Sequence, residues 1–218
     1  MSISRATLLL LAILLTTAVS AKTIYVDDDA AGSGDGTSWT DAYAALQDAL
    51  AAASSGDEIL VAAGVYKPDR GVGINPGNRN VSFSLKAGVI LRGGIGGTST
   101  LSGDLLGNDA LDFTNRGDNS HRVVTCTVGW AASPTLDGFT VTGGCALADP
   151  FQGGGLYCAT NASPVITNCV FRDNIAQTGG ALYTDNFRST ISNCSFINNV
   201  ATAGGALCTT FDVRACGT

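Results

Sequence analysis

The sequence predicts an all-β fold of short strands stacked coil on coil, and three observations support this prediction. The segment Phe171–Asn174 returns as Phe196–Asn199, and the Gly-Gly-Ala-Leu element at 179–182 returns at the same interval, at 204–207. A fixed period of about 20–50 residues is typical of solenoids. The apolar stretches are too short for helices, and their β-branched and aromatic residues are bounded by turn formers, which favours strands.

A coil of such strands buries its apolar face only when it is stacked on its neighbours, at a spacing of about 4.8 Å. The segment from Ser133 aligns with the segment from Ser163, and the next coil follows after a slightly shorter interval. We therefore predict a right-handed parallel β-helix, with three clear coils preceded by less regular ones. A propeller would carry a Trp-Asp pair in each blade and a leucine-rich repeat a ladder of leucines, so both fit less well.

Two groups of residues carry this pattern. The repeat motif consists of Phe171, Asn174, Gly179, Gly180, Ala181, Leu182, Phe196, Asn199, Gly204, Gly205, Ala206 and Leu207. The residues predicted to stack in the core are Ile166, Cys169, Ile191 and Cys194. Strict alternation along residues 165–171 would turn Ile166, Asn168 and Val170 to one face and the residues between them to the other. The Gly-Gly pairs allow corners with positive φ.

Residues 1–21 form a predicted secretory signal peptide. Arg5 provides a positively charged start, residues 8–15 an apolar core, and residues 19–21 a small-residue cleavage site before Lys22. The apolar run falls short of the ~20 residues that a membrane span needs, so we expect no transmembrane span after cleavage.

Residues 22–57 are predicted to hold a short strand, 23–26, and an amphipathic helix, 40–53, that caps the first coil. Thr40 can cap the N-terminus of this helix, and the apolar residues from Tyr43 to Ala53 fall on one of its faces. The open end of a solenoid needs such a cover.

Residues 58–208 are assigned to the coils. Residues 58–66 are predicted to form the first buried strand, residues 81–91 the second coil, and residues 93–97 a turn. The segment 98–122 is long and polar, and we expect a lateral loop there. Loops on a rigid scaffold are the usual place for binding and catalytic residues.

Residues 209–218 depart from the pattern, which calls for another strand of the repeat after Cys208. We expect an irregular segment there. The hypothesis is that the chain is a fragment or a frame-shifted product of a longer protein, because a last coil without a polar cap exposes a strand edge.

Several of these motifs resemble those of known secreted proteins. The alternating Phe-x-x-Asn and Gly-Gly-Ala-Leu elements resemble the repeats of polymorphic outer membrane proteins, which are surface-exposed β-helix passengers of autotransporter type. The N-terminal part is similar to that of secreted bacterial β-helix proteins through the segments 24–28, 34–39, 46–50, 102–104 and 136–139. The resemblance implies a pectate-lyase-like β-helix at the cell surface or outer membrane. It implies little about activity, because this superfamily holds lyases, glycosidases, adhesins and stalks.

The composition limits the possible partners. The chain has 218 residues, a formal net charge of −6 and 14% charged residues, which suits one extracellular domain and argues against nucleic acid. The run Asp27–Asp29 and Asp35 leave calcium open as a ligand, although their spacing does not match an EF-hand loop. We expect a solvated acidic turn and no cofactor.

Seven cysteines lie in the repeating half, so at least one is unpaired. Cys169 and Cys194 are expected to stack as buried thiols, because a free cysteine in a core behaves as a small hydrophobe. Cys145 and Cys158, which flank a variable loop, are the candidates for a disulfide. The absence of a Cys-x-x-Cys pair argues against zinc.

We expect a structural or adhesive module that binds polysaccharide or another cell surface, and we assign no catalytic residue. The alternative is a polysaccharide lyase or glycoside hydrolase of the pectin-lyase-like superfamily. A lyase needs a basic residue on the coils, for which the candidates are Arg92, Arg122, Arg172 and Arg188. Only Arg172 has an adjacent carboxylate in sequence, Asp173, and a glycosidase would pair Asp173 with Asp185.

The single histidine, His121, is expected in a surface loop. As a general base it would need an orienting carboxylate, and Asp118 is near in sequence. A groove that brought Arg122, Asp118 and Asp173 together would favour the enzyme.

Overall fold

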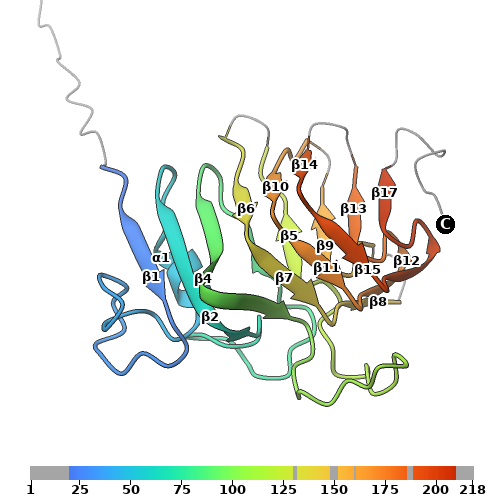
Figure 1. Ribbon diagram of the computed structural model, residues 1–218, viewed down its shortest axis with the longest axis horizontal. Helices are drawn as coiled ribbons and strands as arrows, with labels where there is room; N and C mark the ends of the chain where they lie inside the picture. The colour runs from blue at the N-terminus through green and yellow to red at the C-terminus, as the bar shows by residue number, and fades with distance from the viewer. Residues whose placement is uncertain (1–19, 130–131, 148–151, 160, 186–188, 210–218) are drawn as a thin grey trace, which may run out of the picture.

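Short parallel strands stack coil on coil along the described chain (Figure 1). The structure is a computed structural model that describes residues 20–129, 132–147, 152–159, 161–185 and 189–209. Within these residues the elements are β1 (Thr23–Val26), α1 (Leu46–Ala52), β2 (Glu58–Tyr66), β3 (Phe83–Ser84), β4 (Ile90–Ser102), β5 (Val124–Cys126), β6 (Thr135–Asp137), β7 (Phe139–Thr142), β8 (Cys145–Ala146), β9 (Leu156–Cys158), β10 (Val165–Thr167), β11 (Val170–Arg172), β12 (Ile175–Thr178), β13 (Leu182–Thr184), β14 (Thr190–Ser192), β15 (Ser195–Ile197), β16 (Val200–Ala203) and β17 (Leu207–Thr209).

The strands form three parallel sheets, which are the faces of the stack. One runs in the order β14-β10-β6-β4-β7-β11-β15, with β1 and β2 joined to it through β4. The second runs β16-β12-β8 and the third β17-β13-β9-β5-β3. Every strand pairing is parallel, and strands far apart in sequence lie side by side, so the predicted all-β parallel solenoid is confirmed.

The interior coil (residues 165–184) and the last described coil (residues 190–209) pair in the register that the repeat predicts. Ile166 lies opposite Ile191 and Phe171 opposite Phe196. Ile166 and Phe171 are fully buried, in one core cluster that runs from the N-terminal strands to the interior coil, and Ile191 and Phe196 pack against it half-buried. Matching apolar residues thus stack along the inside of the coils.

The corner between β10 and β11 changes which residues face the core. Ile166, Cys169 and Phe171 are all buried, whereas Asn168 is exposed, so strict alternation along 165–171 is wrong. Asn168 has a φ of 53°, in the left-handed region that asparagine tolerates better than most residues. This turn breaks the strand in two and restarts the alternation after it. Its counterpart Asn193 has a φ of 52°.

The two glycines of each Gly-Gly pair have different roles. Gly179 and Gly204 have φ values of 64° and 63°, as expected for corners that need a glycine. Gly180 is required for space, because a Cβ there would lie 2.5 Å from the carbonyl oxygen of Val200 and 2.7 Å from that of Gly205. The pair therefore lets one coil turn while its backbone stays close to the next coil.

Asn174, the last residue of the Phe-x-x-Asn element, is fully buried and fully hydrogen-bonded. Its Nδ2 donates to the carbonyl of Val141 at 3.0 Å and to Oδ1 of Asn199 at 3.0 Å, and its Oδ1 accepts from the N–H of Gly144 at 2.9 Å. Asn199 in turn donates to the carbonyl of Phe171 at 2.9 Å. These side chains satisfy backbone groups at a corner where the strands stop pairing.

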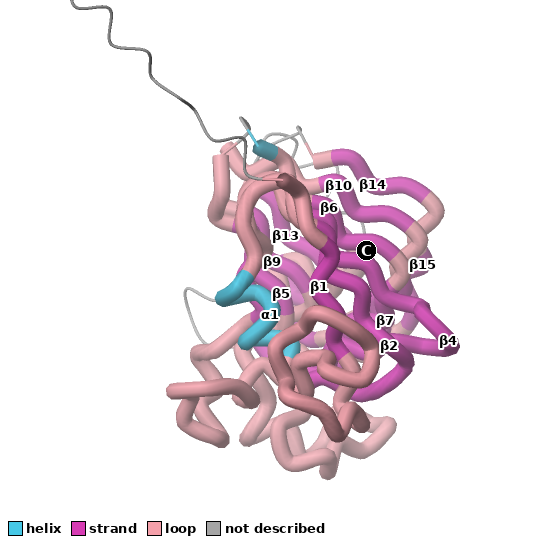
Figure 2. Tube along the Cα trace, turned by 90° about the vertical axis from the view of Figure 1, so that its left-hand side faces the viewer, coloured by secondary structure: helices cyan, strands magenta, loops and turns pink. Residues whose placement is uncertain are grey.

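At the N-terminal end, α1 packs against β1, β2 and β3 and contributes Leu46, Ala49 and Leu50 to the core (Figure 2). The helix is shorter than the sequence predicts, because it begins only after Ala45 and has no side-chain cap. Thr40 lies in a turn, and Tyr43 pairs with Val26 as an isolated bridge. A tertiary backbone contact therefore replaces the first turns of the predicted helix. The predicted signal peptide lies almost wholly outside the described residues.

The predicted turn at 93–97 and the start of the predicted loop at 98 are wrong, because β4 continues through both to Ser102. Its pairing with β2 shifts register twice, and Gly94, Gly96 and Gly97 have positive φ. Bulges of this kind bend a strand without ending it. One end of β4 consequently pairs with β6 and the other with β7, and the lateral loop begins only at residue 103.

Five cysteines are free in the described residues: Cys126, Cys145, Cys158, Cys169 and Cys194. Cys145 and Cys158 are buried thiols, so their assignment as disulfide candidates is wrong. Cys208 is disulfide-bonded.

Within the described residues, no helix combines the length and the apolar character needed to cross a membrane.

Candidate functional site

The lateral loop 103–123 folds back onto the outside of the coils, and Asp104 organises its first turn. Both oxygens of the Asp104 carboxylate accept backbone N–H groups: Oδ1 those of Gly107 at 2.6 Å and Asn108 at 3.1 Å, and Oδ2 that of Asp109 at 3.1 Å. A carboxylate that accepts several N–H groups fixes a turn locally. The loop therefore has a defined shape before it reaches the coils.

Arg116 and Asn119 attach this loop to two coils. Asn119 is fully buried, and its Nδ2 donates to the carbonyl of Gly143 at 2.6 Å and to Oδ2 of Asp109 at 2.8 Å. The guanidinium of Arg116 donates to the carbonyl of Asp173 at 2.6 Å and lies 3.4 Å from Oδ2 of Asp109. The loop is thereby held against the corners that follow β7 and β11.

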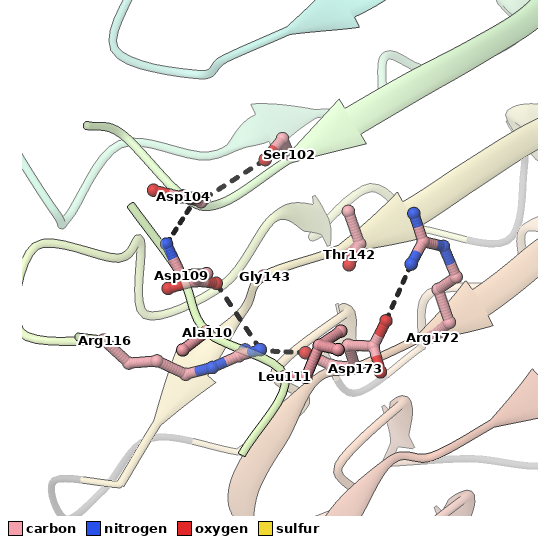
Figure 3. Close-up of a pocket in the computed structure, with 10 residues that line it drawn as sticks. All are labelled: Ser102, Asp104, Asp109, Ala110, Leu111, Arg116, Thr142, Gly143, Arg172 and Asp173. Carbon is pink, nitrogen blue, oxygen red and sulfur yellow. Dashed lines mark hydrogen bonds and ion pairs between the residues drawn. The ribbon is translucent and has the colours of Figure 1, made fainter. Parts of the chain in front are cut away.

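A cavity of about 150 Å³ lies between the loop and these corners, and Figure 3 shows its charged side chains. The carboxylates of Asp104, Asp109 and Asp173 and the guanidinium groups of Arg116 and Arg172 line it. Ser102, Thr142 and Gly143 complete the coil side. A site with donors and acceptors on both walls can bind a polyhydroxylated molecule, because each hydroxyl both donates and accepts.

Asp173 and Arg172 form the coil side of the charged lining. Asp173 has a φ of 54°, and Nη1 of Arg172 lies 2.8 Å from its Oδ2. Oδ1 of Asp173 accepts from Nδ2 of Asn198 on the last described coil at 2.7 Å. The Asp173 carboxylate is thus oriented by partners on both sides.

Asp109 has the most perturbed environment among the carboxylates of the cavity. Its burial raises the pKa of the carboxyl group, and the hydrogen bond from Asn119 and the charge of Arg116 only partly oppose this effect. Its Oδ1 is buried and has no hydrogen-bond partner in the described residues. Desolvation therefore favours the protonated form of the Asp109 carboxyl group.

The cavity contains only some of the residues considered for catalysis from the sequence. Asp173 and Arg172 line the cavity, but Arg122 and Asp118 do not. Arg122 donates to the carbonyl of Gln152 at 2.9 Å and stacks on Tyr157, and Asp118 accepts from the N–H of Leu106 at 2.9 Å. The arrangement that would have favoured the enzyme, with Arg122, Asp118 and Asp173 together, is therefore not found in this cavity.

The other predicted candidates lie elsewhere. Asp185 is not part of the cavity lining, and Arg188 lies outside the described residues. Arg92 carries ion pairs with both Glu58 and Asp137, which raise its pKa, so Arg172 is not the only candidate with a carboxylate partner. These two pairs join three successive coils through the paired strands β2, β4 and β6.

The residues that sequence reasoning missed are Asp104, Asp109 and Arg116. Their signal was present, since the loop is rich in Asp, Asn and Arg, but no spacing rule indicates which of these side chains meet the coils.

The N-terminal carboxylates cap turns: Asp35 accepts from the N–H of Thr37 at 2.9 Å, and Asp41 accepts from the N–H of Ser33 at 2.9 Å. Among the described residues, no cluster of three or more His, Cys, Asp or Glu side chains could hold a metal ion.

Comparison with known proteins supports the same fold. Residues 108–214 match the family model described as a right handed beta helix region. Searches among curated proteins and among solved structures found no match. The matched segment covers most of the lateral loop and all described strands from β5 onward. The parallel sheets and this match together identify the fold as a right-handed parallel β-helix.

Proposed function

We propose that this protein is a secreted or cell-surface β-helix module that binds polysaccharide in the cavity between the lateral loop and the coils. The observation that carries the proposal is the charged lining of that cavity, with Asp104 and Asp109 on the loop side and Arg172 and Asp173 on the coil side. A volume of about 150 Å³ is of the order that accepts one six-membered ring. Pockets with a few convergent polar groups are the usual binding sites of proteins.

The coils extend this site along the stack axis. Thr142, Arg172 and Ile197 lie in register on successive coils, and Asn198 supports Asp173 from the last of them. Coils stacked at about 4.8 Å repeat their side chains at equal intervals. Such a surface suits a polymer, whose sugar units also repeat along one direction.

The proposed location rests on the sequence. A positively charged start, an apolar core and a small-residue cleavage site are typical of exported chains. A chain released outside the cell, or displayed on an outer membrane as the resemblance implies, would meet polysaccharides and other cell surfaces. An adhesive or structural role is consistent with both places.

A second candidate function is carbohydrate cleavage, and Asp109 favours it. A glycoside hydrolase needs one carboxyl group that stays protonated and another that stays ionised. The raised pKa of Asp109 suits the acid, and Asp173, 2.8 Å from Arg172, is the carboxylate on the opposite wall of the cavity. In this version the same cavity would turn over its ligand.

One experiment tests both candidates. The mature chain from Lys22 is mixed with neutral and acidic polysaccharides, with and without calcium, and both binding and the release of shortened or unsaturated products are measured. The variant Asp173→Asn, which alters the cavity, is compared with Arg92→Gln, which alters an ion-paired corner outside it.

Saturable binding without products, weakened at least tenfold by Asp173→Asn and unchanged by Arg92→Gln, supports the binding module. Product release that is lost in Asp109→Asn supports the enzyme instead. Failure of every polysaccharide to bind would contradict both and leave a scaffold.

A further inference from the structure

A second cavity, of about 390 Å³, lies behind the lateral loop and is lined by basic residues. Its lining consists of Arg79, Arg116, Gly117, His121, Cys145 and Leu147. Arg116 also belongs to the first cavity, so the two spaces meet at one guanidinium group. None of the described residues of this lining is a carboxylate. The first cavity, by contrast, is lined by three carboxylates.

The basic groups of this cavity are held in place by backbone and buried side chains. Nε of Arg79 donates to the carbonyl of the buried Asn119 at 2.6 Å, and the N–H of His121 donates to the carbonyl of Arg79 at 2.9 Å. Nδ1 of His121 lies 3.3 Å from the carbonyl of Cys145, an acceptor, so Nδ1 carries the proton. Fixed donors of this kind lower the entropy cost of binding.

Arg116 has an unused donor at this place. Its side chain is only 8 % exposed, and its two terminal nitrogens contact Asp173 and Asp109. Its Nε, however, is buried and has no hydrogen-bond partner in the described residues. A buried guanidinium N–H without an acceptor costs free energy, so the position of Arg116 is fixed by its two terminal nitrogens.

The positive charges of nearby arginines affect the pKa values of His121 and Cys145 in this cavity. Burial is the main reason for the lowered pKa of His121, and the positive charges of Arg79 and Arg122 lower it further. Burial raises the pKa of the Cys145 thiol, and the charges of Arg79 and Arg116 oppose this rise. Asp109, the ion-pair partner of Arg116, acts on Cys145 in the opposite direction to these two cations.

We propose that this cavity is an oxyanion-binding site, in which Arg79, Arg116 and His121 receive a sulfate, phosphate or carboxylate group. The group is either a free anion or the acidic substituent of a saccharide that extends from the first cavity past Arg116. The saccharide source rests on the proposed polysaccharide binding, whereas the anion site itself does not. Arginine donors match the geometry of such oxyanions.

His121 is the single histidine of the chain, so its ring resonances report on this cavity without interference. The mature chain from Lys22 is titrated with pH and followed by NMR of the His121 ring, in sodium sulfate and in sodium chloride at equal ionic strength. A bound anion favours the imidazolium form, so sulfate should raise the pKa of His121 by about one unit, and the rise should saturate. An equal pKa in the two salts would overturn the proposal.

Variants of Arg79 test whether the sulfate response arises in this cavity. Arg79→Gln should weaken sulfate binding about tenfold or more, whereas Arg79→Lys, which keeps the charge and tests for a misfolded variant, should retain part of it. Arg92→Gln is the control, because Arg92 lies in an ion pair outside both cavities. An Arg79→Gln chain that folds and binds sulfate like the unchanged protein contradicts the site.

A carboxylate of the chain itself is the competing occupant, and Asp149, which lies outside the described residues, is the acidic residue nearest in sequence to Leu147. If Asp149→Asn lowers the pKa of His121 and sulfate binds only to that variant, the chain fills its own site and the proposal is wrong. If Asp149→Asn leaves the sulfate response unchanged, the proposal stands.

Competition with oligosaccharides then shows whether the site binds a free anion or the acidic substituent of a saccharide. A uronic-acid oligosaccharide, a sulfated oligosaccharide and a neutral oligosaccharide are each added to the sulfate-bound chain. Displacement of sulfate by one of the two acidic oligosaccharides alone assigns the site to that substituent. Sulfate binding without displacement supports a free-anion site, and it would stand even if the proposed polysaccharide binding failed.

Discussion

The interior coil and the last described coil are near copies of one sequence, yet they differ in packing. Ile166 and Phe171 of the interior coil are fully buried, whereas Ile191 and Phe196 are only half-buried. The interior coil has a described neighbour on both sides and the last coil on one side. Position in the stack therefore decides how much a repeated residue contributes to stability. Four matched pairs of residues, each pair one repeat apart, test this statement.

The largest costs, and a twofold difference between the two coils, are expected for the stacked phenylalanines. Phe171→Ala should lower the free energy of unfolding by about 4 kcal/mol, because it leaves a cavity in a fully buried column. Phe196→Ala should cost about half of that, because its ring packs at 5.5 Å on Phe171 but has solvent beside it. Urea unfolding of the two variants measures the difference, and equal midpoints would contradict it.

A difference of similar size, from smaller costs, is expected for the stacked asparagines. Asn174→Ala leaves the buried N–H of Gly144 without its partner and removes one donor from the carbonyl of Val141, and it should cost about 3 kcal/mol. Asn199→Ala should cost about 1 kcal/mol, because water can replace its bonds at a half-exposed position. Thermal and urea unfolding provide the measurement. Asn174→Asp serves as a control that keeps the shape but removes two donors.

Alanine substitutions at the second glycine of each Gly-Gly pair should differ less in how much they lower the free energy of unfolding. Gly180→Ala places a methyl group against the carbonyls of Val200 and Gly205, and it should cost about 2 kcal/mol. At Gly205 the nearest atom to a Cβ is the carbonyl oxygen of Asn199 at 3.2 Å, so Gly205→Ala should cost less than about 1 kcal/mol. If Gly205→Ala proves the more damaging, the end coil is as tightly packed as the interior.

The stacked cysteines should differ in reactivity. Hydrogen bonding with Cys169 lowers the pKa of Cys194, and the same contact raises the pKa of Cys169. A lowered pKa increases the thiolate fraction at neutral pH, and the thiolate is the reactive form. Iodoacetamide should therefore modify Cys194 at least about tenfold faster than Cys169 at pH 7, with a smaller ratio as the pH rises. Mass spectrometry of the peptides measures both rates, and the unfolded chain, where both should react alike, is the control.

Much of the fold could be predicted because the repeat acts locally and identically in each coil. The spacing from Phe171 to Phe196 indicates the register, and stacked copies must pair in register for every apolar side chain to stay inside. Strict alternation failed at Asn168, because a single left-handed residue between two short strands resets which side chains face inward. No propensity rule locates such a residue in advance.

The candidate site was only partly predictable, for a different reason. Arg172 and Asp173 belong to the repeat, so their place on a coil follows from its period. Asp109 and Arg116 belong to a loop with no period, and what they contact depends on how that loop folds back. The predicted helix also ended up shorter, because the pairing of Tyr43 with Val26 replaced its first turns.

The sequence by itself determined the stacked parallel coils, because a pattern that repeats at a fixed interval can bury its apolar positions only against its own copies. The tertiary structure decided the rest. It closed the lateral loop over the corners at Gly143 and Asp173, and it placed acidic groups on one side of Arg116 and basic groups on the other. The reason is that these contacts join residues about 24 to 57 positions apart in sequence, where only folding brings them within hydrogen-bond distance.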